Sequence, residues 1–413
     1  MECAPKNKKL QFALLLYVFL LLFFLIVNFF QNSDSSLVPF ALKYFKKIDL
    51  ETGRYYFWER LVPSTLYRVG QICLLAYLIK SAYRPNFVKS FFARLEKSQV
   101  KLTFFKILFL FIFLFFLKIP FDIFIGFGLK KYFALTKASF LVWLFRYLGS
   151  SLLEILIISG AGFILVVVIK RVKKYIFFIP MVVFGMSLLY LITYPRLITP
   201  LFYDEVKIEN PILSEEINNL AVKAEIDSSQ IKFLNTSQDS LMVNAYFIGF
   251  GPFRRIILYD TLLEKFSVKE ILAILAHEMG HFKEEHILVG LSLACLGSFL
   301  GLLLIDFMSL FIFNFRLREL VIKEKFFHII FILILTFFLI KPIKNMVSRN
   351  IETRADKFSL EITSEPETFI NMKVKLALQN KSNIAPNPVY AWFFYTHPPI
   401  LERIRYAEEF YKK

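Results

Sequence analysis

Seven apolar runs, each about as long as a bilayer is thick, constrain the fold of this chain more than any other feature. They are Leu10–Phe30, Leu61–Leu78, Leu102–Phe124, Leu148–Ile169, Tyr175–Thr193, Ile287–Phe313 and Phe326–Ile343. A helix needs about 20 apolar residues to cross the hydrocarbon core, so each run is a candidate membrane span. The second run differs from the others in that it contains Arg68 near its middle. The sequence therefore predicts a multi-pass integral membrane protein that is mainly α-helical.

Composition agrees with membrane insertion and argues against binding to nucleic acid. Hydrophobic residues make up 57% of the chain, more than a soluble domain usually holds. The formal charge of +17 comes mostly from short basic clusters between apolar runs, where such residues set the orientation of membrane proteins. We therefore expect the lipid bilayer as a partner, and no nucleic acid. The three cysteines, Cys3, Cys73 and Cys295, are far apart and predict neither a disulfide framework nor a cysteine zinc site.

Four ionisable residues fall within the apolar runs: Arg68, Asp122, Glu154 and Asp306. A charge at the centre of a membrane helix costs about 2.5 to 3.5 kcal/mol on insertion scales, so such residues usually face a partner or a wet cavity. One interpretation is a helix bundle that encloses water. The other, which fits Asp122 and Asp306, is that these side chains lie near helix ends and reach the interface. The sequence leaves both open.

Two polar segments, 196–286 and 345–413, flank the last two apolar runs. In the first of them, Asn210–Glu225 has apolar residues at helical spacing. The stretches "QIKFLNT" and "FRRIILYD" have the composition of short strands, and "IGFGPF" is a turn signal between "MVNAYF" and the second strand. We therefore expect a small α+β unit outside the membrane.

Three of the five histidines fall in "ILAILAHEMGHFKEEH", residues 271–286. A preceding capping box, Ser267 with Glu270, predicts a helix that starts one residue after Ser267. On that helix, His277 and His281 are four residues apart on one face, which suits two imidazoles that bind the same zinc ion.

Glu278 follows the first of these histidines and is placed to act as a general base, which completes the H-E-x-x-H pattern of zinc peptidases. The alternative is a pair of ordinary polar helix residues. His286 lies five residues beyond His281, about 140° further round a continuous helix, so we expect an interfacial residue rather than a ligand.

A catalytic zinc site needs three protein ligands and one open position. The candidate third ligand is Glu352 in "SRNIETRADKFSL", just after the last apolar run. Asp356 is four residues further along the same predicted helix and can accept a hydrogen bond from the outer nitrogen of a zinc-binding histidine. The alternative is a solvated ladder of ion pairs with Arg349 and Arg354, which spacing alone would favour.

Four stretches together resemble the motifs of the CAAX prenyl protease family of membrane zinc metallopeptidases, in that family's order. They are "NAYFIGFGPFRRIILYDTLLE", "LAHEMGHFKEEH", "SRNIETRADKFSL" and "YTHPPILERI". The resemblance covers nearly the whole chain and implies a seven-helix barrel around a water-filled chamber, closed by a gluzincin-like α+β peptidase domain. The stretch "IGFGLKKYFALTKASF" departs from the family's acidic loop, which implies a difference in substrate selection.

Transferred to this sequence, the resemblance implies one zinc ion per chain, bound by His277, His281 and Glu352, with Glu278 as the general base. It matches Asn244 to a residue that holds the substrate backbone, and His397 to a histidine that stabilises the tetrahedral oxyanion. The implied activity is that of a metalloendopeptidase which cleaves near the C-terminus of prenylated or hydrophobic peptides.

The domain organisation that follows has four parts. Residues 1–195 form an N-terminal transmembrane region of about five helices, and 196–286 form a zinc peptidase domain with the histidine-rich helix. Residues 287–344 form two transmembrane helices, and 345–413 form the C-terminal part of the peptidase domain with the third ligand.

Two other functions fit the sequence. One is a general protease for the quality control of membrane proteins, which would use the same machinery and which the sequence does not separate from the first. The other is a non-catalytic scaffold or transporter with structural histidines, against which Glu278 argues, because a scaffold has no need of a general base.

Two signals disagree on sidedness. Basic loops follow the second, fourth and sixth apolar runs, at 84–101, 170–174 and 316–325. By the positive-inside rule the N-terminus would be cytoplasmic, which places the zinc domain on the far side after five spans. The resemblance implies the opposite, and we favour it. The sequence does not identify the membrane.

Overall fold

The computed structural model describes residues 8–29, 37–81 and 99–412. Seven apolar helical spans lie within them: Lys8–Phe29, Lys47–Lys80, Leu102–Tyr132, Phe140–Arg171, Tyr175–Leu201, His286–Phe313 and Phe326–Thr363. All seven predicted runs are confirmed as long apolar helices, including the second. The protein is therefore a multi-pass integral membrane protein.

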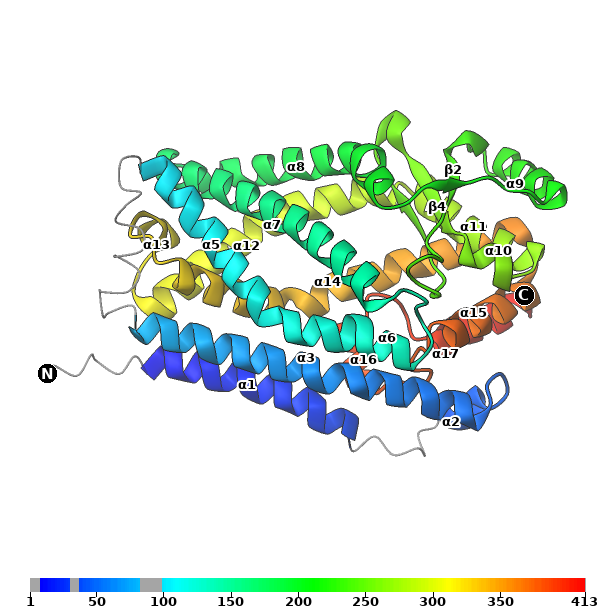
Figure 1. Cartoon of the computed structure of the whole chain (residues 1–413), viewed down its shortest axis with the longest axis horizontal. Coiled ribbons are helices and arrows are strands. Elements are labelled where there is room, and N and C mark those ends of the chain that lie inside the picture. The colour runs from blue at the N-terminus through cyan, green and yellow to red at the C-terminus, as the bar shows by residue number, and fades with distance from the viewer. Residues whose placement is uncertain (1–7, 30–36, 82–98, 413) are drawn as a thin grey trace, which may run out of the picture.

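The long helices run side by side along the length of the molecule (Figure 1). They are α1 (Lys8–Phe29), α3 (Lys47–Ser81), α5 (Gln99–Asp122), α7 (Phe140–Arg171), α8 (Tyr175–Thr193), α12 (His286–Phe313) and α14 (Phe326–Thr363). Shorter helices join or flank them: α2 (Leu37–Ala41), α6 (Leu129–Tyr132) and α13 (Leu317–Ile322). The N-terminal end of the molecule lies opposite the end that holds the sheet and the C-terminus.

Helix α14 continues from the membrane into the polar domain. It has 38 residues and contains Pro342, so at 1.5 Å per residue it is about 57 Å long, well beyond the roughly 30 Å of a hydrocarbon core. The predicted apolar run ended at Ile343, but the helix does not. Its C-terminal part carries Glu352 and Asp356 into the polar domain.

Three of the four ionisable residues in the apolar runs have a hydrogen-bond partner or face a cavity. The Asp306 carboxylate accepts hydrogen bonds from Arg316 Nη1 at 2.6 Å and from the Leu317 amide at 2.8 Å. It therefore links the last turns of α12 to the start of α13. Asp122 accepts from the Tyr147 hydroxyl at 2.7 Å. Glu154 lines a cavity of about 710 Å³ together with residues of α7, α8 and the segments that flank them.

The polar domain contains a four-stranded sheet in the order β1-β2-β4-β3. Its strands are β1 (Glu205–Val206), β2 (Ile231–Leu234), β3 (Ala245–Ile248) and β4 (Arg255–Tyr259). β2 pairs with β4 in parallel, and β3 pairs with β4 antiparallel. The predicted strands and the turn "IGFGPF" are confirmed, and β1 was not predicted. Gly249 has φ +100, and a Cβ there would lie 2.1 Å from the Phe253 carbonyl oxygen, so only glycine fits this turn.

Helices cover the sheet and complete the domain core. They are α9 (Pro211–Lys223), α10 (Thr261–Lys265), α11 (Val268–Lys283), α15 (Pro366–Gln379) and α17 (Ile400–Tyr411). A further helix, α16 (Pro388–Phe394), packs instead against the membrane helices α1 and α14. The predicted amphipathic helix is α9, with Leu213, Ile217 and Leu220 buried. Helix α11 lies in the middle of this core, where nearly every residue from Ile271 to Gly280 is buried. The domain thus joins residues before α12 to residues after the membrane part of α14.

Candidate active site

Helix α11 begins where the sequence predicts. Ser267 is its N-cap, and the amide of Ser267 donates to Glu270 Oε2 at 2.8 Å. Lys375 from α15 donates to the same carboxylate at 2.9 Å. The cap fixes the start of the helix, and the start fixes which residues point toward α14.

A glycine lets α11 and α14 approach closely. A Cβ on Gly280 would lie 3.0 Å from the Ala355 Cα and 3.1 Å from both the Ala355 oxygen and the Phe358 Cβ. Since backbone atoms of α14 occupy that space, a side chain at 280 must push the helices apart. Gly280 sits between the two histidines of α11, so this close approach brings them within reach of Glu352.

Gly280→Ala is expected to destabilise the fold by about 1–3 kcal/mol, the usual effect of overpacking a tight contact. Thermal unfolding in detergent measures the change. Gly297→Ala on α12 is the matched control, because nothing lies within 4 Å of a Cβ there. Equal unfolding temperatures for both variants would show that the α11–α14 contact tolerates a methyl group.

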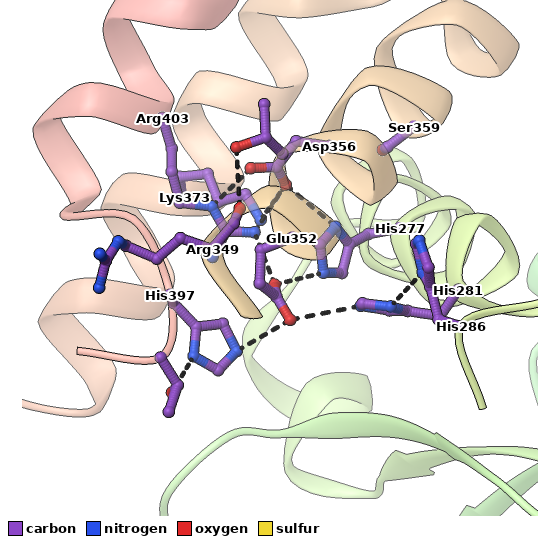
Figure 2. A network of polar contacts seen from close by, with 12 residues as sticks. His277, His281, His286, Arg349, Glu352, Asp356, Ser359, Lys373, His397 and Arg403 are labelled. Carbon is purple, nitrogen blue, oxygen red and sulfur yellow. Dashed lines mark hydrogen bonds and ion pairs between the residues drawn. The ribbon is translucent and has the colours of Figure 1, made fainter. Parts of the chain in front are cut away.

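Three side chains from the two helices converge on one point (Figure 2). His277 Nε2 lies 3.3 Å from Glu352 Oε2, and His281 Nε2 lies 3.5 Å from Glu352 Oε1. One ligand atom from each of the three residues lies within 4.8 Å of the others. Within the described part of the chain, the buried Oε2 of Glu352 has no hydrogen-bond partner. Two imidazoles and a carboxylate that meet at one point fit a zinc ion.

Asp356 lies behind His277. Its Oδ1 is 3.0 Å from His277 Nδ1, on the ring edge that faces away from Glu352. Arg403 from α17 donates to both Asp356 oxygens at 2.6 Å, and the Lys373 ammonium is 3.1 Å away. Asp356 and Lys373 are both buried, so their charges must balance within the site. The sequence reasoning missed Arg403 and Lys373, although Arg403 belongs to the quoted stretch "YTHPPILERI".

Glu278, which lies between the two histidines in the sequence, is buried. Burial raises the pKa of its carboxyl group, while the neighbouring His277 acts in the opposite direction. Burial also lowers the pKa of His281 to about 3, helped by the neighbouring His277. His281 is therefore neutral, and only a neutral imidazole can bind a metal.

His397 reaches the same carboxylate from the loop before α17. Its Nε2 lies 3.3 Å from Glu352 Oε1, and its side chain is 58% exposed. The Thr396 hydroxyl is 2.9 Å from its Nδ1. His397 therefore stands at the open side of the three-residue cluster, where a ligand would approach.

Asn244 lies directly before β3 and is exposed. Its carbonyl oxygen accepts a hydrogen bond from the Tyr259 amide at 3.1 Å. β3 has a partner on one side only, at the edge of the sheet, and the ring of its Phe247 contacts Phe282 of α11 at 5.2 Å between centroids. The edge strand thus runs beside the histidine helix.

One part of the prediction for His286 was wrong: His286 does not lie on the same continuous helix as His281. α11 ends at Lys283, Glu285 has a left-handed φ of 53°, and α12 starts at His286. Only one continuous helix would place His286 about 140° from His281. The break instead returns His286 toward His281, and the two Nδ1 atoms lie 2.9 Å apart.

The alternative of a solvated ladder of ion pairs does not match the structure. Arg354 pairs with Glu284 at 3.7 Å, and Arg349 donates to backbone carbonyls near α16, the closest being Tyr395 at 2.7 Å. Glu352 and Asp356 are instead buried and face the histidines.

Two family models match consecutive parts of the chain. Residues 56–204 match "CAAX prenyl protease N-terminal, five membrane helices", and residues 207–410 match "Peptidase family M48". The junction between them lies where the membrane helices of the N-terminal half give way to the sheet.

Related proteins agree with both models. A protein of Bacillus subtilis described as "Uncharacterized metalloprotease YhfN" is 31% identical over 58% of this chain and 58% of its own length. The CAAX prenyl protease 1 homolog of Oryza sativa subsp. japonica is 29% identical over 70% of this chain and 69% of its own. CAAX prenyl protease 1 of Saccharomyces cerevisiae is 27% identical over 69% and 67%. The matched regions thus span between about half and two thirds of these proteins.

The fold matches a solved structure over almost its whole length. The crystal structure of S. mikatae Ste24p superposes with a TM-score of 0.83 and covers 98% of this chain and 100% of that one, at 20% identity. The predicted fold class is therefore confirmed: about seven transmembrane helices joined to an α+β domain of the zinc peptidase type. The M48 family model implies a bound metal, in keeping with the cluster of His277, His281 and Glu352. Together these matches show that the chain belongs to the CAAX prenyl protease type of peptidase family M48.

Proposed function

We propose that this protein is a zinc metalloendopeptidase that hydrolyses a peptide bond near the C-terminus of prenylated or hydrophobic peptides. The observation that carries the proposal is the meeting of His277, His281 and Glu352 at one point, with Glu278 next to His277 on the same helix. That combination provides a metal site and a general base together.

In this proposal, residues 196–286 and 345–413 act as one peptidase domain, and the two spans of 287–344 separate its halves in the sequence. His277, His281 and Glu352 hold one zinc ion per chain. When bound, zinc would supply Lewis acidity that makes water easier to deprotonate and polarises a peptide carbonyl.

The chain's own residues carry the proton transfers. Glu278 takes a proton from the attacking water and delivers it to the leaving amine nitrogen. Its burial favours this role, since a carboxyl group whose pKa is raised accepts a proton more readily. His397, at the open side of the cluster, donates a hydrogen bond to the oxyanion that forms on the scissile carbonyl. Asp356 faces the outer nitrogen of His277 and fixes its tautomer.

The edge strand offers a place for the substrate backbone. β3 pairs with β4 on one side only, so an extended peptide can add to its free edge. Asn244, exposed at the start of β3, would hold that peptide in register beside α11. The bond to be cleaved would then face the histidine helix.

The prenylated substrate is suggested by the names of the relatives, which are CAAX prenyl proteases in rice and yeast. Quality control of membrane proteins is the second candidate, because the same site would cleave any extended hydrophobic segment. The chain's departure from the family in "IGFGLKKYFALTKASF" bears on this choice, since Gly126 and Lys130 of that stretch line the 710 Å³ cavity.

A peptide cleavage assay tests the proposal. Purified protein is given a farnesylated peptide with a C-terminal CAAX sequence and its unprenylated twin, each with and without a metal chelator. We expect chelator-sensitive cleavage, faster for the farnesylated peptide. Equal rates for both peptides would favour quality control. If neither is cleaved, or if chelation has no effect, the proposed function is wrong.

A further inference from the structure

His286 is a buried histidine with no role in the proposed reaction. It is 7% exposed, and its Nδ1 lies 2.9 Å from the Nδ1 of His281. The two rings meet on the side of His281 that faces away from Glu352 (Figure 2). This contact involves a candidate metal ligand, so it bears on the metal site.

The geometry sets the direction of this hydrogen bond. His281 Nε2 faces Glu352 Oε1 at 3.5 Å, and its Nδ1 faces His286. If Nε2 gives its lone pair to a metal, the ring proton must be on Nδ1, which then donates. The Nδ1 of His286 must accept, so the proton of His286 is on its own Nε2. The reverse arrangement would put the His281 proton on Nε2 and block metal binding.

We propose that His286 is the positioning residue for His281: it accepts the Nδ1–H hydrogen bond, selects the metal-binding tautomer and fixes the ring orientation. This inference rests on the metal site of the proposed function. Asp356 stands in the corresponding place for His277, with Oδ1 3.0 Å from that ring's Nδ1. Each histidine of the pair therefore has an atom able to accept within 3.0 Å of its outer nitrogen, a carboxylate oxygen for one and an imidazole nitrogen for the other.

A break between two helices delivers this acceptor. Glu285 adopts φ 53° between α11 and α12, and Arg254 from the turn before β4 holds its carboxylate at 2.5 Å. The same guanidinium lies 4.8 Å from the centroid of the Phe282 ring. His286 is the first residue of α12, a membrane span. The orientation of a metal ligand is thus tied to the position where a membrane helix begins.

Metal binding by variants tests the proposal independently of peptide cleavage. His286→Phe keeps a ring but removes the acceptor, and His286→Asn restores an acceptor through its amide oxygen. We expect His286→Phe to lower zinc affinity by roughly 10–100-fold, the usual effect of losing such a partner. We also expect it to change the visible spectrum of the cobalt-substituted protein, with partial recovery of both in His286→Asn. Chelator competition measures the affinity.

His328→Phe is the matched control. It replaces another buried histidine on a membrane helix, whose ring lies 4.6 Å from that of Phe313. It should leave zinc affinity and the cobalt spectrum unchanged. If His286→Phe does not fold, His286→Leu, which also lacks an acceptor, takes its place.

Wild-type zinc affinity and an unchanged cobalt spectrum in a folded, acceptor-free variant would overturn the role of His286. This outcome is distinct from a failure of the proposed function. If the variants show that zinc binding depends on His286, but the wild-type protein cleaves no peptide, then the proposed peptidase function is wrong and the positioning role of His286 stands.

Discussion

Glu278→Gln is expected to lower the rate of peptide hydrolysis by about 10²–10⁴-fold, the range that general acid–base catalysis contributes, while zinc content and fold stay the same. Glutamine has nearly the same shape as glutamate, so the buried position on α11 remains filled. The amide cannot take a proton from water. The chain would then bind metal and peptide but lack the group that moves the proton.

The control for this variant is Glu284→Gln. Glu284 lies at the end of the same helix, is 41% exposed and pairs with Arg354, so its loss should leave hydrolysis unchanged. Rates are measured at saturating peptide, with zinc determined in the same samples. Undiminished cleavage by Glu278→Gln would remove Glu278 from the mechanism.

Glu352→Ala is expected to lose both zinc and hydrolysis. The change removes the only candidate ligand that α14 supplies to the cluster within the described residues, and two histidines alone do not complete a catalytic zinc site. It also leaves the Arg403 guanidinium, 3.7 Å from the carboxylate, with one buried acidic partner fewer. We expect less than one zinc per chain after dialysis, and no measurable cleavage.

Glu361→Ala on the same helix is the matched control. Glu361 pairs with Lys357 at 3.5 Å on the exposed side of α14, so this variant should keep its zinc. One zinc ion per chain in Glu352→Ala would exclude Glu352 as a ligand.

Much of the site was predictable because its signals are local. Ser267 and Glu270, within one stretch of four residues, predict the start of α11. The spacing of His277 and His281 predicts that both lie on one face of that helix. The same logic placed Glu352 and Asp356 on one face of a helix. Such patterns need no knowledge of the rest of the fold.

Other features depend on tertiary contacts that no local pattern encodes. The left-handed residue before α12 is Glu285, not glycine or asparagine, so the sequence carries no sign of the break that turns His286 toward His281. Lys373 lies among apolar residues of α15 and meets Asp356 only through folding. A proline inside a helical pattern usually ends or kinks the helix, yet α14 continues through Pro342 and delivers the third candidate ligand.

Zinc-dependent peptide hydrolysis is tested most directly by returning zinc to metal-free wild-type protein while hydrolysis is followed. We expect no hydrolysis without metal and a rate that rises in proportion to added zinc, reaching its maximum at one zinc ion per chain. Hydrolysis by the metal-free protein, or no hydrolysis after one equivalent of zinc is bound, would contradict this expectation.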